Sequence, residues 1–405
     1  MTFNSFKLSR WRQYENIDIL FHPRLTILTG ANGAGKTTVL NLLSRHYGWN
    51  PTFVSTPERE SKIGLKYLTD LWQSWFTQNK PTTIAFGSIV YSDGTTSQLS
   101  VPTENAQGNY QININGIKPI NGIHIPSHRP VFYYTKVSQI PTMPPKKKAI
   151  FENHRNYIQR PFNGGHVDKP ANTLMKETLI ALAVFGEGNS HVSSDSEALR
   201  LFNGFQEVLK MVLPEDIGFL KLQIENPEVV LVTSSGNFSL DAVSGGIAAI
   251  LDIVWQIYMA SEGEDTFVVT IDEPENHLHP KLQRTFLPNL LKAFPKAQFV
   301  VVTHNPFVVT SVPESNVYVL DYNEEKRVFS RNLDLVNRAG DANEILTDVL
   351  GLPTPSPIWV EQKIDHIVTK YSSAGLTKEN VDALRKELID AGLGTLFTDT
   401  LVKIK

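Results

Sequence analysis

The sequence predicts an α/β protein with a parallel or mixed sheet, and two segments carry most of that prediction. Residues 25–29 form an apolar run that leads into the glycine-rich stretch GANGAGKT at 30–37, after which apolar residues recur at helical spacing. Residues 267–271 form a second apolar run that ends in the adjacent acids Asp272 and Glu273. A buried parallel strand that ends in carboxylates is typical of the ligand-binding edge of an α/β sheet.

The first half of the chain predicts a further layer of strands. Short strands are expected over residues 3–29, with a helix over 38–46. Apolar residues three and four apart favour a second helix over 63–76. From 82 to 137 the pattern alternates or runs apolar between two Asx-Gly turns, and its last expected strand is 131–137. We therefore expect an antiparallel β-layer inserted after the glycine-rich loop.

The second half predicts mostly helices. Residues 140–172 are rich in Pro, Lys, Gly and Asn and are expected to form a loop or the base of a lid. The other expected elements are helices at 173–185, 196–213, 244–258, near 281–293 and at 378–391, a hairpin over 219–233, and strands at 267–271 and 299–303.

Composition limits the class of protein. The 405 residues are 41% hydrophobic and 20% charged, which is ordinary for a globular chain. A net charge of −3 gives no global basic field for nucleic acid, and the absence of cysteine excludes disulfides and thiolate sites. The N-terminus lacks the apolar core of a signal peptide and no apolar run could span a bilayer, so we expect a cytoplasmic protein without a membrane partner.

Residues 30–37 match the phosphate-binding loop GxxxxGK[ST] between a strand and a helix. Glycines allow backbone N–H groups to turn inward around phosphate oxygens, and the helix N-terminus adds partial positive charge. Lys36 would bridge the β- and γ-phosphates, Thr37 would ligate Mg²⁺, and Thr38 could reach the α-phosphate. The other loop residues expected at the nucleotide are Gly30, Asn32, Gly33 and Gly35. The sequence thus predicts ATP and Mg²⁺ as cofactors.

Two polar strand ends supply candidate catalytic groups. Asp272 would bind the Mg²⁺ through water, and Glu273 would polarise the attacking water; the alternative is a pair of solvated acids. His304 follows the apolar run 299–303 and could touch a γ-phosphate, although a lone histidine there is more often structural.

Two weaker patterns leave alternatives open. Ser244, Gly245 and Gly246 open a helix, so they could grip an anion or simply cap the helix. His277 and His279 imitate a metal pair, but a turn after the acids explains them better.

The order GANGAGKT, SGG, IDEPENHLHP, THNP resembles the ABC-type ATPases related to RecF, SMC and Rad50. That resemblance implies an ABC-ATPase head: a RecA-like parallel or mixed sheet, an antiparallel β-layer and a helical lid. It also implies a dimer in which Ser244 and Gly246 cap the γ-phosphate held by the other subunit. The residues implied to act within their own subunit are Lys36, Thr37, Asp272, Glu273 and His304.

The motif DEPENHLHP and the N-terminal segment that ends in GANGAGKTT resemble the corresponding sequences of a narrower group, the ATPases of bacterial phage-defence systems. This group includes overcoming-lysogenization-defect nucleases and the ATPases of Septu, retron and PARIS systems. The resemblance implies an ATPase domain at 1–350 and a C-terminal helical segment at 351–405. Within the ATPase domain, the β-layer would comprise about 1–29 and 82–139, the lid about 140–215, and the RecA-like core 30–50 and 244–322.

Three departures from the family pattern stand out. Val243 replaces the leading leucine of the serine-glycine motif, and Ile247 replaces the polar residue after its second glycine. The nucleotide-contacting glutamine should follow a strand of the β-layer, and Gln139 is the candidate, against an ordinary loop glutamine. No acidic cluster of a fused nuclease follows His304, so we expect the ATPase alone.

These observations favour a sensor or scaffold that forms a homodimer or higher homo-oligomer and controls a separately encoded effector, a nuclease or toxin. A RecF-like ATPase that closes on DNA is the alternative, and a transporter subunit is a second one. The basic segment 144–160 is either a solvated loop or a contact for nucleic acid or an acidic partner protein.

Overall fold

The computed structural model describes residues 1–60, 64–68, 82–102, 108–162, 164–261, 265–333, 358–374 and 377–404. The chain divides into two compact units, Met1–Asp341 and Ala342–Lys405. In the described part of the second unit, helices surround an apolar core that includes Ile364, Leu384 and Leu388. These helices are α9 (Ile358–Ala374), α10 (Lys378–Asp390) and α11 (Phe397–Lys403).

The first unit is built on a mixed sheet. Eleven of the described strands form it in the order β10-β8-β7-β1-β2-β18-β17-β3-β16-β15-β11. Their bounds are β1 (Phe3–Trp11), β2 (Tyr14–Leu20), β3 (Leu25–Gly30), β7 (Thr83–Tyr91), β8 (Thr96–Pro102), β10 (Asn113–Asn115), β11 (Gly122–Ile125), β15 (Phe267–Asp272), β16 (Ala297–Val302), β17 (Asn316–Tyr322) and β18 (Val328–Leu333). Strands β17, β3, β16, β15 and β11 are parallel. Strands β10, β8, β7, β1 and β2 are antiparallel. The α/β class with a mixed sheet is confirmed.

The two halves of this sheet differ in burial as their sequences predict. Every residue of β3, β15 and β16 is buried, because helices cover a parallel sheet on both faces. Strand β2 instead alternates buried and less buried positions, which is typical of an antiparallel layer with one solvated face.

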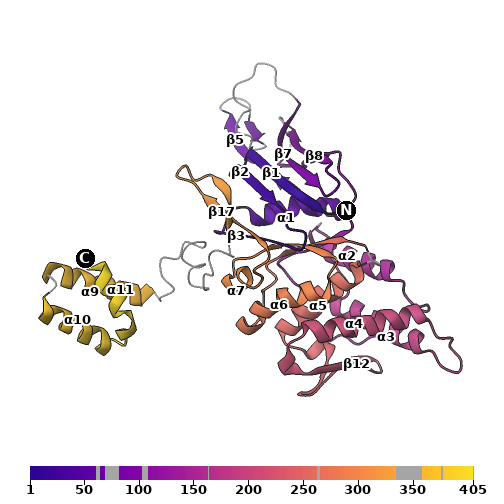
Figure 1. Ribbon diagram of the computed structural model, residues 1–405. Helices are drawn as coiled ribbons and strands as arrows, with labels where there is room; N and C mark the ends of the chain where they lie inside the picture. Colours follow the sequence, from indigo (N-terminus) through magenta and orange to yellow (C-terminus); the bar gives the residue numbers. More distant parts are fainter. Residues whose placement is uncertain are drawn as a thin grey trace. The chain divides into compact units, whose positions relative to one another are not determined.

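Helices and small strands complete the first unit. The helices are α1 (Lys36–Ser44), α2 (Lys147–Phe162), α3 (Ala171–Glu187), α4 (Ser196–Val212), α5 (Gly245–Ala260), α6 (Pro280–Ala293) and α7 (Pro306–Val309). The small pairings are β12 (Phe219–Glu225) with β13 (Glu228–Thr233) and β14 (Gly236–Ser239), β4 (Phe53–Val54) with β9 (Asn109–Tyr110), and β5 (Thr56–Glu60) with β6 (Gly64–Leu68). Figure 1 shows α3 and α4 at the opposite end of the unit from β1, β7 and β8. Helix α5 is apolar almost all round because it packs against α2, α4 and β11.

The helix expected over 63–76 is wrong where the structure describes it. Strand β6 occupies part of that range and pairs with β5, from Thr56 opposite Leu68 to Glu60 opposite Gly64. Apolar spacing over so short a stretch fits a strand as well as a helix, and the pairing decides between them. The remainder of 63–76 lies outside the described residues.

The strand expected at 131–137 is also absent, and the loop expected at 140–172 contains helix α2 and the start of α3. Residues 131–137 form no β-ladder with any strand that the structure describes. Instead, the carbonyls of Tyr133 and Thr135 accept hydrogen bonds from Asn172 and Lys176. Gln139 therefore does not follow a strand. The strand that precedes this region is β11, which joins the parallel sheet rather than the antiparallel layer.

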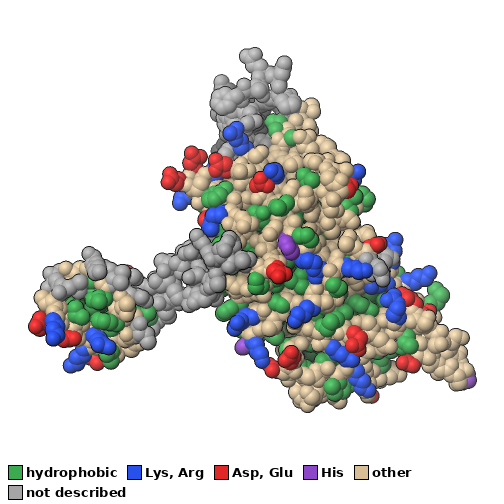
Figure 2. All heavy atoms as spheres, in the orientation of Figure 1, with side chains coloured by type: hydrophobic (Ala, Val, Ile, Leu, Met, Phe, Trp, Pro, Cys, Tyr) green, Lys and Arg blue, Asp and Glu red, His purple; other side chains and the backbone are tan. Residues whose placement is uncertain are grey.

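Charged side chains of both signs lie on the visible face of the first unit (Figure 2). Figure 2 shows Lys and Arg side chains interspersed with Asp and Glu over one face of the first unit. This agrees with a net charge of −3. Within the part of the chain that the structure describes, no helix is both long and apolar enough to cross a bilayer.

Candidate nucleotide-binding site

The glycine-rich loop connects β3 to α1 at the carboxyl edge of the parallel sheet. Gly30 has φ 122°, and a Cβ there would lie 2.2 Å from the Leu320 carbonyl oxygen of β17. Gly35 has φ 89°, and a Cβ there would lie 2.0 Å from the Tyr14 hydroxyl. That hydroxyl donates to the Gly35 carbonyl at 2.7 Å, and Gln13 Nε2 donates to the Gly33 carbonyl at 3.4 Å. Two glycines are therefore required by sterics as well as by backbone conformation.

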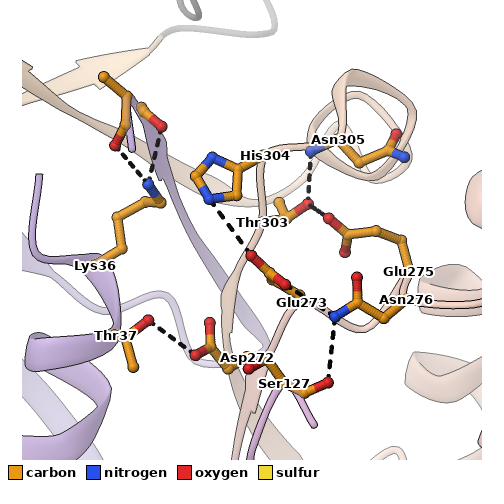
Figure 3. A network of polar contacts seen from close by, with 12 residues as sticks. Lys36, Thr37, Ser127, Asp272, Glu273, Glu275, Asn276, Thr303, His304 and Asn305 are labelled. Carbon is orange, nitrogen blue, oxygen red and sulfur yellow. Dashed lines mark hydrogen bonds and ion pairs between the residues drawn. The ribbon is translucent and has the colours of Figure 1, made fainter. Parts of the chain in front are cut away.

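Lys36 is buried at the start of α1 and points into the loop (Figure 3). Its ammonium donates to the carbonyls of Gly30 at 2.9 Å and Ala31 at 2.8 Å. Burial lowers the pKa of Lys36 to about 8, while Asp272 and Glu273 oppose that shift. Phosphate oxygens could take the place of the two carbonyls, since an ammonium group can donate three hydrogen bonds in varied directions.

Thr37 and Asp272 lie together although they come from distant parts of the sequence. The Thr37 hydroxyl donates to Asp272 Oδ2 at 2.9 Å (Figure 3). Burial raises the pKa of Asp272, and the Thr37 hydrogen bond counteracts this effect. A hydroxyl beside a carboxylate fits Mg²⁺, which binds few protein oxygens and keeps water or phosphate oxygens as its other ligands. No cluster of three or more His, Asp or Glu residues suited to a metal occurs among the described residues.

Glu273 and His304 form the second half of the site. His304 Nε2 lies 3.5 Å from Glu273 Oε1, and Asn276 Nδ2 donates to Glu273 Oε2 at 2.9 Å (Figure 3). Burial lowers the pKa of His304, and Lys36 adds to that effect while Glu273 opposes it. Glu273 adopts φ 48°, in the left-handed region that is strained for a side chain with a Cβ. A half-buried carboxylate beside a histidine suits a group that orients water.

The structure brings these residues together through strand register. Strands β15, β16 and β3 are adjacent and parallel, so their carboxyl ends share one edge. Glu273 follows β15, His304 follows β16, and Lys36 follows β3. Thr303 reinforces this edge, because its hydroxyl donates to Glu275 Oε1 at 2.5 Å and accepts from the Asn305 amide at 2.9 Å.

Ser244 lies apart from this cluster. It is exposed, it is the N-cap residue of α5, and its side chain makes no capping hydrogen bond. None of the hydrogen bonds found in the described segments connects it to the glycine-rich loop. Close packing also favours glycine at position 246, since a Cβ there would lie 2.9 Å from the His277 carbonyl oxygen. The exposed Ser244 hydroxyl therefore makes neither a capping bond nor a hydrogen bond to the glycine-rich loop of its own chain, as far as the described residues show.

The remaining candidates have simpler surroundings. Asn32 and Gly33 are exposed on the loop, and the Thr38 side chain hydrogen-bonds Tyr14. Gln139 is exposed, and among the described residues no hydrogen bond ties it to Thr37 or Asp272. His279 Nδ1 accepts from the Lys281 amide and caps α6, which explains the histidine without a metal.

Two functional candidates escaped the sequence reasoning. Asn276 lies within ENHLHP but had no assigned role, and it holds both Glu273 and the Ser127 carbonyl. Arg129 follows β11 and contacts the backbone of Asp272 and Glu273. The only available signal was the polar run SHR at the end of an apolar strand, which resembles the other two polar strand ends.

Two family models match parts of the chain. One, described as "AAA domain, putative AbiEii toxin, Type IV TA system", matches residues 212–310. The other, described as "AAA domain", matches residues 5–52. Together these two ranges contain the glycine-rich loop, the acid-tipped strand and His304.

Relatives align over different fractions of the chain. Septu protein PtuA from Bacillus thuringiensis is 21% identical over 410 residues, covering 91% of this chain and 88% of that protein. Retron Ec83 probable ATPase from Escherichia coli is 30% identical over 184 residues, covering 43% of this chain and 29% of the relative. Retron Vc95 probable ATPase from Vibrio cholerae serotype O1 biovar El Tor is 27% identical over 223 residues, covering 52% of this chain and 42% of the relative.

The chain is thus similar to a Septu protein over most of its length and to two retron ATPases over about half of it. This confirms the family resemblance carried by the four motifs. The chain spans most of the Septu protein but less than half of either retron ATPase. Among solved structures, the SMC head domain from Thermotoga maritima aligns with this chain at 12% sequence identity and a TM-score of 0.44. The alignment covers 82% of this chain and 99% of the SMC head chain.

Proposed function

We propose that this chain binds ATP with Mg²⁺, hydrolyses it, and uses the nucleotide state to hold and control a separately encoded effector, a nuclease or toxin, in antiphage defence. The observation that carries the ATPase assignment is the meeting of Lys36, the Thr37–Asp272 pair and the Glu273–His304 pair at one edge of the sheet. The defence role is supported by similarity to a Septu protein along 91% of the chain.

Each group has a defined task in this proposal. Lys36 exchanges its two carbonyl partners for phosphate oxygens, and the glycine-rich loop surrounds the phosphates with N–H groups. Thr37 and Asp272 would hold Mg²⁺, which neutralises phosphate charge. Glu273 accepts a proton from the attacking water, and His304 orients Glu273 and faces the γ-phosphate. Thr38 and Gln139 remain candidate nucleotide contacts.

The proposed oligomer rests on Ser244. Its exposed hydroxyl and the free N-terminus of α5 are available to a phosphate held by a second copy. We propose that two chains close on nucleotide in this way, with the helices between residues 140 and 215 forming the lid. Because the closed state needs the γ-phosphate, hydrolysis would release it, and an effector bound to one state would be controlled by that change.

The test is to express the native operon with Glu273→Gln in a tagged chain, which should retain ATP and the closed state. We expect a nuclease or toxin encoded in the operon to co-purify. Lys36→Ala serves as the matched control, since it should bind no ATP and lose the effector. Stoichiometric DNA without a protein partner would instead favour a RecF-like ATPase, and ATP binding that survives Lys36→Ala would contradict the site itself.

A further inference from the structure

One buried cation joins the loop after β11 to the catalytic edge of the sheet. Arg129 Nη2 donates to the carbonyl of Asp272 at 3.1 Å and to that of Glu273 at 3.1 Å. Its Nε and Nη1 are buried and make no hydrogen bond within the described part of the chain. Burying a guanidinium is costly unless carbonyls or carboxylates surround it, so this placement indicates a specific task.

Four carboxylates act electrostatically on Arg129. Burial lowers its pKa, whereas Asp252 of α5 and the carboxylates of Asp272, Glu273 and Glu275 oppose that shift. Arginine remains charged in proteins, so Arg129 is a fixed positive charge behind the acid-tipped strand. It therefore offsets repulsion among acids that the sheet edge brings together.

The two carbonyls that Arg129 holds define the turn at the end of β15. Glu273 has φ 48°, a conformation that a non-glycine residue keeps only when its surroundings fix it. In this turn the neighbouring carboxylates diverge: Asp272 reaches Thr37, and Glu273 reaches His304. Asn276 fixes the Glu273 side chain from the other direction and is itself bound to the Ser127 carbonyl, close to Arg129 in sequence.

We propose that Arg129 is a positioning residue for Glu273: by clamping the carbonyls of Asp272 and Glu273, it holds the left-handed turn that separates the metal-binding carboxylate from the water-orienting one. This inference rests on the proposed ATPase function and adds a residue to it. Among the described residues, the hydrogen bonds of Arg129 go to the backbone of Asp272 and Glu273 and not to the glycine-rich loop, so its loss should affect the rate of hydrolysis rather than nucleotide affinity.

The experiment compares Arg129→Met with Arg24→Met. Arg24 is a matched control because it also clamps backbone carbonyls, those of Leu291, Phe294 and Ala297, near the start of β16. We expect Arg129→Met to lower kcat by about 100-fold, the scale expected for a misplaced catalytic group, with Kd for ATP changed by no more than about threefold. Arg24→Met should leave kcat near the wild-type value, although both variants lower the melting temperature.

A double variant separates positioning from general stability. Residues that act as one unit are non-additive, so Arg129→Met combined with Glu273→Gln should hydrolyse ATP no more slowly than Glu273→Gln alone. Arg129→Lys keeps a charge able to reach both carbonyls and should recover part of the lost kcat. If Arg129→Met does not fold, the Arg129→Lys variant tests the proposal instead. A reduced kcat with unchanged ATP affinity in that variant would support the positioning role.

The outcomes distinguish the two levels of the proposal. A wild-type chain that binds ATP without any turnover would overturn the proposed hydrolysis and the role of Arg129 with it. Wild-type turnover together with an Arg129→Met variant as fast as Arg24→Met would overturn the role of Arg129 alone. So would a kcat loss that multiplies with that of Glu273→Gln, or an Arg129→Lys variant that loses ATP binding in parallel with kcat.

Discussion

At the scale of single residues, the site depends on side chains and backbone angles that neighbours fix. Lys36 is held by hydrogen bonds to two carbonyls of its own loop. Glu273 is held by His304, by Asn276 and, through its backbone, by Arg129. Such preorganisation reduces the rearrangement needed during reaction.

Gly35→Ala tests the steric requirement of the loop. The alanine would have to keep the backbone φ of 89° at position 35, and its Cβ would lie 2.0 Å from the Tyr14 hydroxyl. A left-handed conformation alone costs an alanine roughly 1–2 kcal/mol, so ATP affinity should fall by at least about tenfold as the loop shifts. Titration with a fluorescent ATP analogue measures this loss.

Gly94→Ala is the matched control, since Gly94 has φ 82° but nothing within 4 Å of its Cβ position. It should carry the same backbone strain without altering ATP binding. Equal ATP affinities of wild type and Gly35→Ala would show that the contact with Tyr14 does not shape the loop.

At the scale of elements, a buried ion pair ties α3 to the segment before Ser244. Lys176 is fully buried on α3, donates to Glu228 Oε2 at 2.9 Å, and also pairs with Asp241. Asp241 lies in the short 3-10 turn η3 (Leu240–Ala242), which leads into α5. The same ammonium donates to the Thr135 carbonyl at 2.7 Å, so it joins three segments with no regular pairing among them.

Lys176→Met should therefore be strongly destabilising. Removing the ammonium leaves the buried Asp241 carboxylate and the partly buried Glu228 carboxylate without a counter-charge, and breaking a buried pair typically costs about 3–5 kcal/mol. Lys169→Met is the control, because its pair with Glu177 is partly exposed and such pairs contribute about 1 kcal/mol or less. Urea unfolding measures both variants, and similar losses would argue against a special role for the buried ammonium.

The elements also show how far sequence patterns reach. The helices α4, α5 and α6 were predictable because long amphipathic or apolar stretches with caps specify a helix locally. Strand β6 and the irregular stretch 131–137 were not predictable, since a short apolar run is compatible with several conformations. Pairing with β5 makes residues 64–68 a strand, and hydrogen bonds from Asn172 and Lys176 hold the stretch 131–137 in its irregular conformation.

At the scale of the whole molecule, the proposed oligomer has a direct test in Ser244→Arg. The substitution should leave ATP binding by its own chain intact, because Ser244 has no bond to that loop, and should abolish ATP-dependent dimerisation in a Glu273→Gln background. Light scattering after size exclusion measures the state. Ser193→Arg, at another exposed serine, should dimerise normally.

Mixing sharpens this test. A Ser244→Arg chain and a Lys36→Ala chain together retain one intact composite site, formed by the loop of the first and the serine of the second. We expect the mixture to recover ATPase activity that neither variant has alone. A mixture that remains inactive would indicate that Ser244 works within its own subunit.

Features with a local physical cause could be predicted from the sequence: the phosphate loop between a strand and a helix, the apolar strands, the acids that end β15, and the order of motifs. Which of these features meet in space depends on the tertiary fold. Parallel register of β3, β16 and β15 puts Lys36, His304 and Glu273 at one edge, and the end of β11 brings in Arg129. These contacts join residues far apart in the chain, and no local pattern encodes such pairings, because they arise when strands and helices pack around a common core.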